Sequence, residues 1–182
     1  MIRTYLFIIL LGLTANIAQA QFPREAKPRM SAIVIGVSRY QFGRFKQLRF
    51  ANRDAEQFAR LLKCAENVQV DTVITLLDEK ATVGNLDMAL ACMNRLLSDT
   101  SSRKPDYVVF YFSGHGQLNN SGPKKKGYFI LHNTDNASSL DMGYPHTDLI
   151  EYVEEWMRYS KKVVVIADAC HSGRLSGKFR SI

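Results

Sequence analysis

The stretch VVVIADACHSG, residues 163–173, is an apolar β run that ends in a turn of small residues containing Asp168 and Cys170. A second stretch, YVVFYFSGHG at residues 107–116, has the same form and ends in His115 between two glycines. Parallel strands present the residues at their carboxyl ends to one shared crevice. We therefore expect a thiol and an imidazole to meet there, as a cysteine nucleophile and its base would.

Hydrophobic periodicity along the rest of the chain alternates between strands and helices. Continuous apolar runs predict buried parallel strands at residues 32–37, 70–77, 107–112 and 163–167. Helical stripes predict helices at residues 51–63, at 82–97 with Thr82 as the cap, and from a cap at Thr147 or Asp148 to about residue 159. Between these elements, residues 116–126 indicate a polar loop and residues 128–131 a short extended segment. This order predicts an α/β fold with a mostly parallel sheet.

The first 20 residues have the form of a secretory signal peptide. Arg3 is the only charged residue before Arg24, residues 6–13 are a short apolar core, and Ala18-Gln19-Ala20 is a typical cleavage site. We therefore expect an exported protein, periplasmic or extracellular, without a membrane anchor. The mature chain would then consist of an N-terminal extension over residues 21–30 and a single domain over residues 31–182.

The charge distribution bears on nucleic-acid binding, and the cysteine positions bear on disulfide formation. The formal net charge is +7, but the basic residues are scattered rather than gathered on one helix, so we expect no nucleic-acid partner. Cys64 and Cys92 fall in the first two predicted helices and look like small core residues. Successive right-handed crossovers running in opposite directions would put these helices on opposite faces of the sheet. We therefore expect no disulfide between them.

The two strand ends supply the groups that cysteine hydrolysis needs. Cys170 would be the nucleophile and His115 the base that later protonates the leaving amine. The backbone N–H groups of Gly116 and Cys170 are the natural oxyanion donors, because both follow strand ends. Taken singly, His115 is more often a loop or core histidine and Cys170 a buried apolar residue, whereas their joint placement at strand ends favours chemistry.

With these residues, the chain resembles the catalytic large-subunit region of the caspase and metacaspase superfamily of cysteine peptidases, over residues 32–173. The resemblance implies a three-layer α/β/α sandwich with a mostly parallel sheet. It also implies a His115–Cys170 dyad, a thioester acyl-enzyme, and an oxyanion hole formed by the N–H groups of Gly116 and Cys170. His171, which follows the cysteine, is expected to point away and to have a secondary role.

The resemblance also suggests a specificity. Asp54 and Asp168 match the two positions at which metacaspases carry pocket aspartates, whereas Leu48 stands where a caspase has an arginine. Ser113 matches a third pocket position. Two carboxylates in a cleft would bind a guanidinium or ammonium group, so we predict cleavage after Arg or Lys. The alternatives are a helix-terminal carboxylate for Asp54, a backbone-bonded one for Asp168 and a core serine for Ser113.

The chain departs from the family pattern in two ways: its acidic residues are scattered, and the strands expected after the cysteine are missing from this sequence. Many metacaspases bind calcium through an acidic cluster, but here only scattered Asp135, Asp141 and Asp148 follow His115. We therefore expect no cofactor and no zinc site, and calcium stays open without an acidic cluster to support it. The family continues with two more strands after the cysteine, which this sequence lacks. The strand at 163–167 would then be a bare edge. We expect a fragment or processed large subunit, or a C-terminal small-subunit-like partner.

Two competing interpretations remain. The chain is either an active endopeptidase acting on proteins or peptides, or an inactive caspase-like interaction module that needs its C-terminal partner. Gingipain-like and legumain-like peptidases also have a strand-end His-Gly and a strand-end cysteine. The pattern around Asp54 and the sequence Asp-Ala-Cys-His-Ser-Gly favour the metacaspase side.

Overall fold

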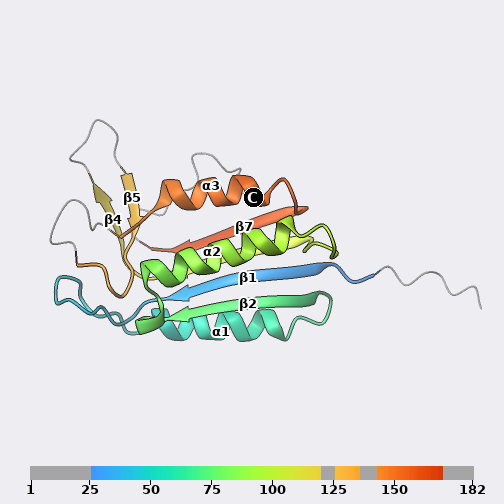
Figure 1. The fold of residues 1–182 in the computed structure, drawn as a ribbon. Helices are drawn as coiled ribbons and strands as arrows, with labels where there is room; N and C mark the ends of the chain where they lie inside the picture. The colour runs from blue at the N-terminus through green and yellow to red at the C-terminus, as the bar shows by residue number, and fades with distance from the viewer. Residues whose placement is uncertain (1–25, 120–125, 136–142, 170–182) are drawn as a thin grey trace, which may run out of the picture.

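The computed structural model describes residues 26–119, 126–135 and 143–169, and these form two sheets and the helices that cover the larger one (Figure 1). The main sheet contains β1 (Arg29–Gly36), β2 (Gln69–Leu77), β3 (Tyr107–Ser113) and β7 (Lys162–Asp168). All its pairings are parallel, in the order β2-β1-β3-β7. The helices are α1 (Ala51–Lys63), α2 (Val83–Ser98) and α3 (His146–Trp156), with a single turn η1 (Asp78–Lys80). The small antiparallel sheet consists of β4 (Gly116–Asn119), β5 (Lys126–Phe129) and β6 (Tyr144–Pro145).

The main sheet lies between two helical layers, which confirms the predicted three-layer sandwich (Figure 1). Because successive strand residues point to opposite faces, Ala32 and Val34 of β1 pack under α1, while Ile33 and Ile35 pack under α2 and α3. The α1 side uses small residues where the helix meets the sheet. The core on the other side is larger and contains the aromatic residues Phe110, Phe112, Phe129 and Trp156.

The strand order fixes where a ligand can bind. From β1 the chain crosses through α1 to β2, and it then returns through α2 to β3 on the other side of β1. Since parallel crossovers are right-handed, this reversal puts α1 and α2 on opposite faces, as predicted. The carboxyl ends of β1 and β3 therefore form the topological switch point, which is where open α/β sheets bind their ligands.

Helix boundaries agree with the periodicity at α1 and α2 and differ at α3. Thr82 caps α2 as predicted, because its hydroxyl accepts the Asn85 N–H at 3.2 Å. The expected cap of α3 at Thr147 or Asp148 is wrong. The helix begins at His146, directly after Pro145, whose extended backbone belongs to β6. The Thr147 hydroxyl instead donates to the Asp148 carboxylate at 3.0 Å.

Two further expectations are corrected. Residues 116–119, expected in a polar loop, form β4 and pair with β5; their polar composition is compatible with a strand because all four are only half-buried. Cys64, expected in the core, is exposed, because it follows the last turn of α1 and lies beyond the buried stripe of Ala55 and Ala59. Cys92 is half-buried, and both thiols are free.

Gly36 sets the distance between the end of β1 and the start of α1. A Cβ atom built at this position would lie 2.5 Å from the Ala55 Cβ and 2.6 Å from the Ala51 carbonyl oxygen. Both obstacles belong to the first turns of α1, and the carbonyl cannot rotate away as a side chain would. The helix that carries Asp54 can therefore lie this close to the strand end only because residue 36 has no side chain.

We predict that Gly36→Ala lowers the free energy of unfolding by about 1–3 kcal/mol, because the added methyl group overpacks a backbone contact. Chemical denaturation measures this change. Gly84→Ala is the matched control, since nothing lies within 4 Å of a Cβ at that helical position. Gly84→Ala should be neutral or stabilise by about 0.5–1 kcal/mol. Equal stability of the Gly36→Ala variant and the native chain would contradict the close approach.

His146 is a buried histidine at the start of α3. Only 3% of its surface is exposed, its ring lies 4.2 Å from that of Phe129, and neither ring nitrogen has a partner among the described residues. Burial lowers the pKa of His146 to about 4. The ring is therefore neutral in the folded protein near neutral pH.

This burial predicts a stability that falls with acid. Below about pH 6.5 His146 becomes protonated in the unfolded chain but stays neutral in the folded chain. The free energy of unfolding therefore decreases as the pH falls from 6.5 toward 4. The full loss from this group is roughly 3 kcal/mol. Denaturation series at pH 7, 5.5 and 4.5 should show a smaller acid loss in His146→Leu than in the native chain. An identical pH dependence in both would contradict the assignment.

Candidate active site

The carboxyl ends of the strands are tied together beyond the regular ladder. The N–H of Val37, which follows β1, donates to the Ser113 carbonyl at 2.9 Å. The N–H of Gly114, which follows β3, donates to the Asp168 carbonyl at 3.2 Å. These two bonds hold the ends of β1, β3 and β7 in one row. Groups attached just beyond these ends therefore have defined relative positions.

His115 is held by contacts on its ring. Its Nε2 atom lies 2.8 Å from the backbone carbonyl oxygen of Lys46. The ring packs against Tyr40 and Phe45, with centroid distances of 5.1 and 6.1 Å. Because a carbonyl oxygen only accepts hydrogen bonds, Nε2 carries the proton at this contact and the Nδ1 atom of the neutral ring keeps its lone pair. The imidazole of His115 can therefore accept a proton at Nδ1.

Tyr40 holds the backbone of the same histidine. Its buried hydroxyl accepts the His115 N–H at 2.9 Å and donates to the Val37 carbonyl at 3.1 Å. Burial raises the pKa of Tyr40, so the phenol stays neutral and keeps both bonds. Gly114 permits this approach, because a Cβ there would lie 3.0 Å from the Phe112 ring and 3.2 Å from the Tyr40 hydroxyl.

The predicted pocket residues lie together on the α1 side of the same edge. Tyr111 and Ser113 are two residues apart in β3 and share a face, and Asp168 is the register partner of Ser113 in β7. Asp54 lies in the first turn of α1, which covers this face. Asp54 and Asp168 are exposed, and Ser113 is buried.

The phenol of Tyr111 is influenced electrostatically by all three of these residues. Its pKa is raised first by burial, and the negative charges of Asp54 and Asp168 raise it further. A side-chain hydrogen bond from Ser113 acts in the opposite direction. The Phe58 ring of α1 stacks on Tyr111 at 4.4 Å. Two carboxylates and two hydroxyls therefore gather at this edge, and we call them the acidic pocket (Asp54, Tyr111, Ser113 and Asp168) after the substrate pocket that the sequence predicts.

Of the remaining predicted residues, the structure places some and does not describe others. Gly116 begins β4 opposite Phe129, directly after the histidine. Leu48 packs against the core on the α2 and α3 side. Cys170 and His171 lie outside the described residues, as does the N–H group that Cys170 would contribute to an oxyanion hole.

Sequence reasoning missed Tyr40, Lys46 and Tyr111. The role of Lys46 lies in its backbone carbonyl, which leaves no signature in a sequence. Tyr40 follows the end of β1 and could have been noticed there as an aromatic residue at the switch point. Tyr111 could have been found from its spacing, because it precedes Ser113 by two residues in a strand.

Metal ligands do not gather in the part of the chain that the structure describes. Nowhere in residues 26–119, 126–135 and 143–169 do three His, Cys, Asp or Glu side chains come close enough to hold an ion. Asp135 pairs with Arg44 at 3.1 Å, and Asp148 lies in the first turn of α3. Asp141 lies outside the described residues. None of the described helices is long and apolar enough to cross a membrane.

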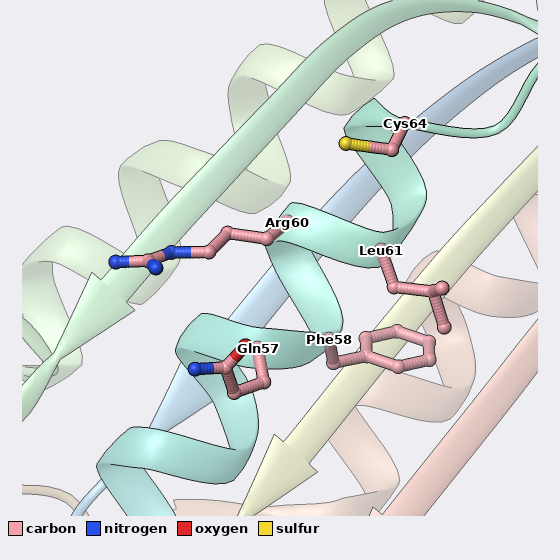
Figure 2. Close-up of a pocket in the computed structure, with 5 residues that line it drawn as sticks. All are labelled: Gln57, Phe58, Arg60, Leu61 and Cys64. Atoms are coloured by element: carbon pink, nitrogen blue, oxygen red, sulfur yellow. The ribbon is translucent and has the colours of Figure 1, made fainter.

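A shallow hollow of about 490 Å³ lies on α1, away from this edge (Figure 2). Its lining comes from the second half of the helix and the residue that follows it: Gln57, Phe58, Arg60, Leu61 and Cys64. Because α1 starts at the carboxyl edge of the sheet and runs toward the opposite edge, this hollow is separate from the histidine. It shares one residue with the acidic pocket, because the Phe58 ring also stacks on Tyr111.

A family model described as the caspase domain matches residues 29–181. The chain belongs to the caspase-domain family. This is a family of cysteine peptidases, which agrees with the strand-end motifs and with the sheet. Among solved structures, the chain is similar to the crystal structure of protein GSU0716 from Geobacter sulfurreducens, with a TM-score of 0.56 and 18% sequence identity. The match covers 80% of this chain and 52% of that one, so the likeness concerns the fold, and this chain spans about half the relative's length. No curated protein matches the chain.

We predict that Tyr40→Phe lowers the free energy of unfolding by about 1–3 kcal/mol, because it leaves the His115 N–H without its acceptor. Hydrogen exchange of that amide, followed by NMR, should become faster than in the native chain. Tyr159→Phe is the control, because that ring is partly exposed and contacts Lys104 rather than the strand ends. Unchanged exchange at His115 in Tyr40→Phe would contradict the proposed contact.

Proposed function

We propose that this caspase-domain chain is a cysteine endopeptidase that cleaves peptide bonds after Arg or Lys. The observation that carries the proposal is the acidic pocket, which lies at the same sheet edge as the oriented His115. A strand-end acidic group beside a strand-end base matches a substrate with a cationic side chain next to the scissile bond. The metacaspase side of the superfamily is the closest match to these residues.

The chemistry assigns one task to each group. His115 Nδ1 takes the proton of the Cys170 thiol, and the thiolate attacks the carbonyl carbon of the substrate. The N–H groups of Gly116 and Cys170 stabilise the oxyanion that forms. The C–N bond then breaks, the His115 proton passes to the leaving amine, and a thioester remains on Cys170. Water, deprotonated by His115, hydrolyses the thioester and restores the thiol.

The charges of the acidic pocket support the choice of substrate. Both Asp54 and Asp168 are exposed, and among the described residues neither forms a salt bridge with a lysine or arginine. Their charges are therefore available to a ligand. A guanidinium group can donate to two carboxylates at once, which a single ammonium group does less well, so arginine is expected to be preferred over lysine.

We predict Cys170-dependent hydrolysis of fluorogenic peptides that end in Arg or Lys. Asp54→Asn and Asp168→Asn should each lower kcat/KM on the arginyl peptide by about tenfold or more, equivalent to about 1.4 kcal/mol per tenfold. Asp148→Asn, in the first turn of another helix, is the matched control and should leave turnover unchanged. Cys170→Ala should abolish hydrolysis. Equal or better turnover of a peptide with Asp before the scissile bond would contradict the proposed specificity.

An interaction module is the second candidate, and β7 favours it. Among the described residues β7 is an edge strand, its valines are only half-buried, and 37% of Ile166 is exposed. Such an edge commonly pairs with another strand. A C-terminal small-subunit-like partner could therefore be needed before any activity develops. Covalent labelling of Cys170 by an arginyl ketone in the folded chain favours the peptidase, and its absence favours the module.

The proposed location follows from the first residues alone. We infer that residues 1–20 direct export and are removed after Ala20. The peptidase would then act in the periplasm or outside the cell on proteins or peptides that carry Arg or Lys. N-terminal sequencing of the mature protein tests this inference directly, because a mature chain that begins at Gln21 is expected.

A further inference from the structure

The carbonyl that orients His115 belongs to an exposed loop. Lys46 lies in residues 37–50, which connect β1 to α1 without forming a helix or strand. A backbone carbonyl is a useful partner for Nε2 only if its position is fixed to within a fraction of an ångström. The loop therefore needs contacts of its own that hold this carbonyl at the 2.8 Å distance found here.

The side-chain amide of Gln47, next to Lys46, supplies such contacts. Its Oε1 atom accepts the N–H of Tyr40 at 2.8 Å, and its Nε2 atom donates to the carbonyl of Tyr40 at 3.0 Å. Both ends of one amide thus bind both backbone groups of one residue. This clamp closes the loop between residues 40 and 47. It also joins the two elements that contact His115, because the Tyr40 hydroxyl binds the histidine backbone and the Lys46 carbonyl binds its ring.

The base of the loop is anchored separately. The Leu48 N–H donates to the Ser38 carbonyl at 2.8 Å. The buried carboxylate of Asp78 accepts the N–H groups of Ser38 and Arg39 at 2.8 and 2.9 Å. The Arg39 carbonyl in turn lies 2.7 Å from the Nδ1 atom of His132. Loss of the Gln47 clamp would therefore free the tip of the loop while its base stays in place.

We propose that Gln47 is a positioning residue, which fixes the Lys46 carbonyl on Nε2 of His115 and so presents Nδ1 to the nucleophile. The expected effect of Gln47 on catalysis rests on the proposed peptidase function, whereas its effect on the bond between His115 Nε2 and the Lys46 carbonyl does not. Gln47 itself touches no reacting atom. Its substitution should alter the histidine ring contact and turnover without changing the acidic pocket on the other face of the sheet.

The test uses NMR of the chain labelled with ¹⁵N-histidine. In the native chain, the Nε2–H proton of His115 should be observable and protected from exchange with water. Gln47→Met keeps the length of the side chain and removes both hydrogen bonds, and it should speed this exchange at least about tenfold. The Nδ1–H proton of His132 is an internal reference for the base of the loop and should not change. Gln57→Met, the same substitution on α1, is the control and should behave as the native chain.

The result that overturns the proposal is a His115 Nε2–H proton equally protected in Gln47→Met and in the native chain. A native chain without this protected proton would overturn it as well. If Gln47→Met does not fold, Gln47→Glu replaces it, because a carboxylate keeps the bond to the Tyr40 N–H and loses the donor to the Tyr40 carbonyl. Faster exchange in this variant supports the proposal and unchanged exchange overturns it.

An activity measurement separates this proposal from the proposed function. On an arginyl peptide, Gln47→Met should lower kcat about tenfold or more with little change in KM, because the pocket is intact. An unchanged kcat would overturn the positioning role. A native chain that folds and has the protected proton but hydrolyses no peptide would contradict the peptidase function, while the exchange data would still decide whether Gln47 holds the loop.

Discussion

The carboxyl edge of the sheet depends on one buried carboxylate. Asp78 follows β2, has a positive φ of 45°, and is 2% exposed. Besides the N–H groups of Ser38 and Arg39, which follow β1, it accepts a hydrogen bond at 2.7 Å from Asn52 in the first turn of α1. A buried carboxylate without such donors would be costly, so its charge enforces these contacts. One side chain thereby fixes a strand end, the base of the loop and the start of the helix that carries Asp54.

The carboxyl edge of the sheet has two sides, one facing α1 and one facing α2 and α3. Ser113 ends β3 facing α1, whereas His115 packs against Tyr40, a residue of the core under α2 and α3. Gly114 lies between them and allows the chain to pass close to the Tyr40 hydroxyl. The proposed base and the proposed cation site are thus separated by a single residue along the chain, while each is supported by a different helical layer.

Sequence reasoning succeeded where the signal is repeated or lies at a strand end. The apolar runs predicted all four strands of the main sheet, and the strand-end rule brought His115 and Asp168 to one edge. It failed where structure depends on single contacts. β4 has no apolar pattern, and its residues are half-buried. Cys64 lies one residue beyond the end of α1, and α3 begins directly after Pro145, which ends a short strand. The contacts of Lys46 and Gln47 with their partners involve backbone atoms, which every residue possesses.

The position of β7 at the edge of the described sheet has a consequence for how firmly the acidic pocket is held together. β7 pairs only with β3 among the described residues, and β3 in turn lies beside β1. Within the described sheet β7, like β2, is an edge strand with a single neighbour, and a strand with fewer contacts opens locally more readily than an interior one. The acidic pocket takes Ser113 from the interior strand and Asp168 from this edge strand. Asp168 is consequently displaced more readily than Ser113. A fluctuation that detaches β7 would separate the two residues and disrupt the pocket, while the His115 imidazole and its loop remained folded.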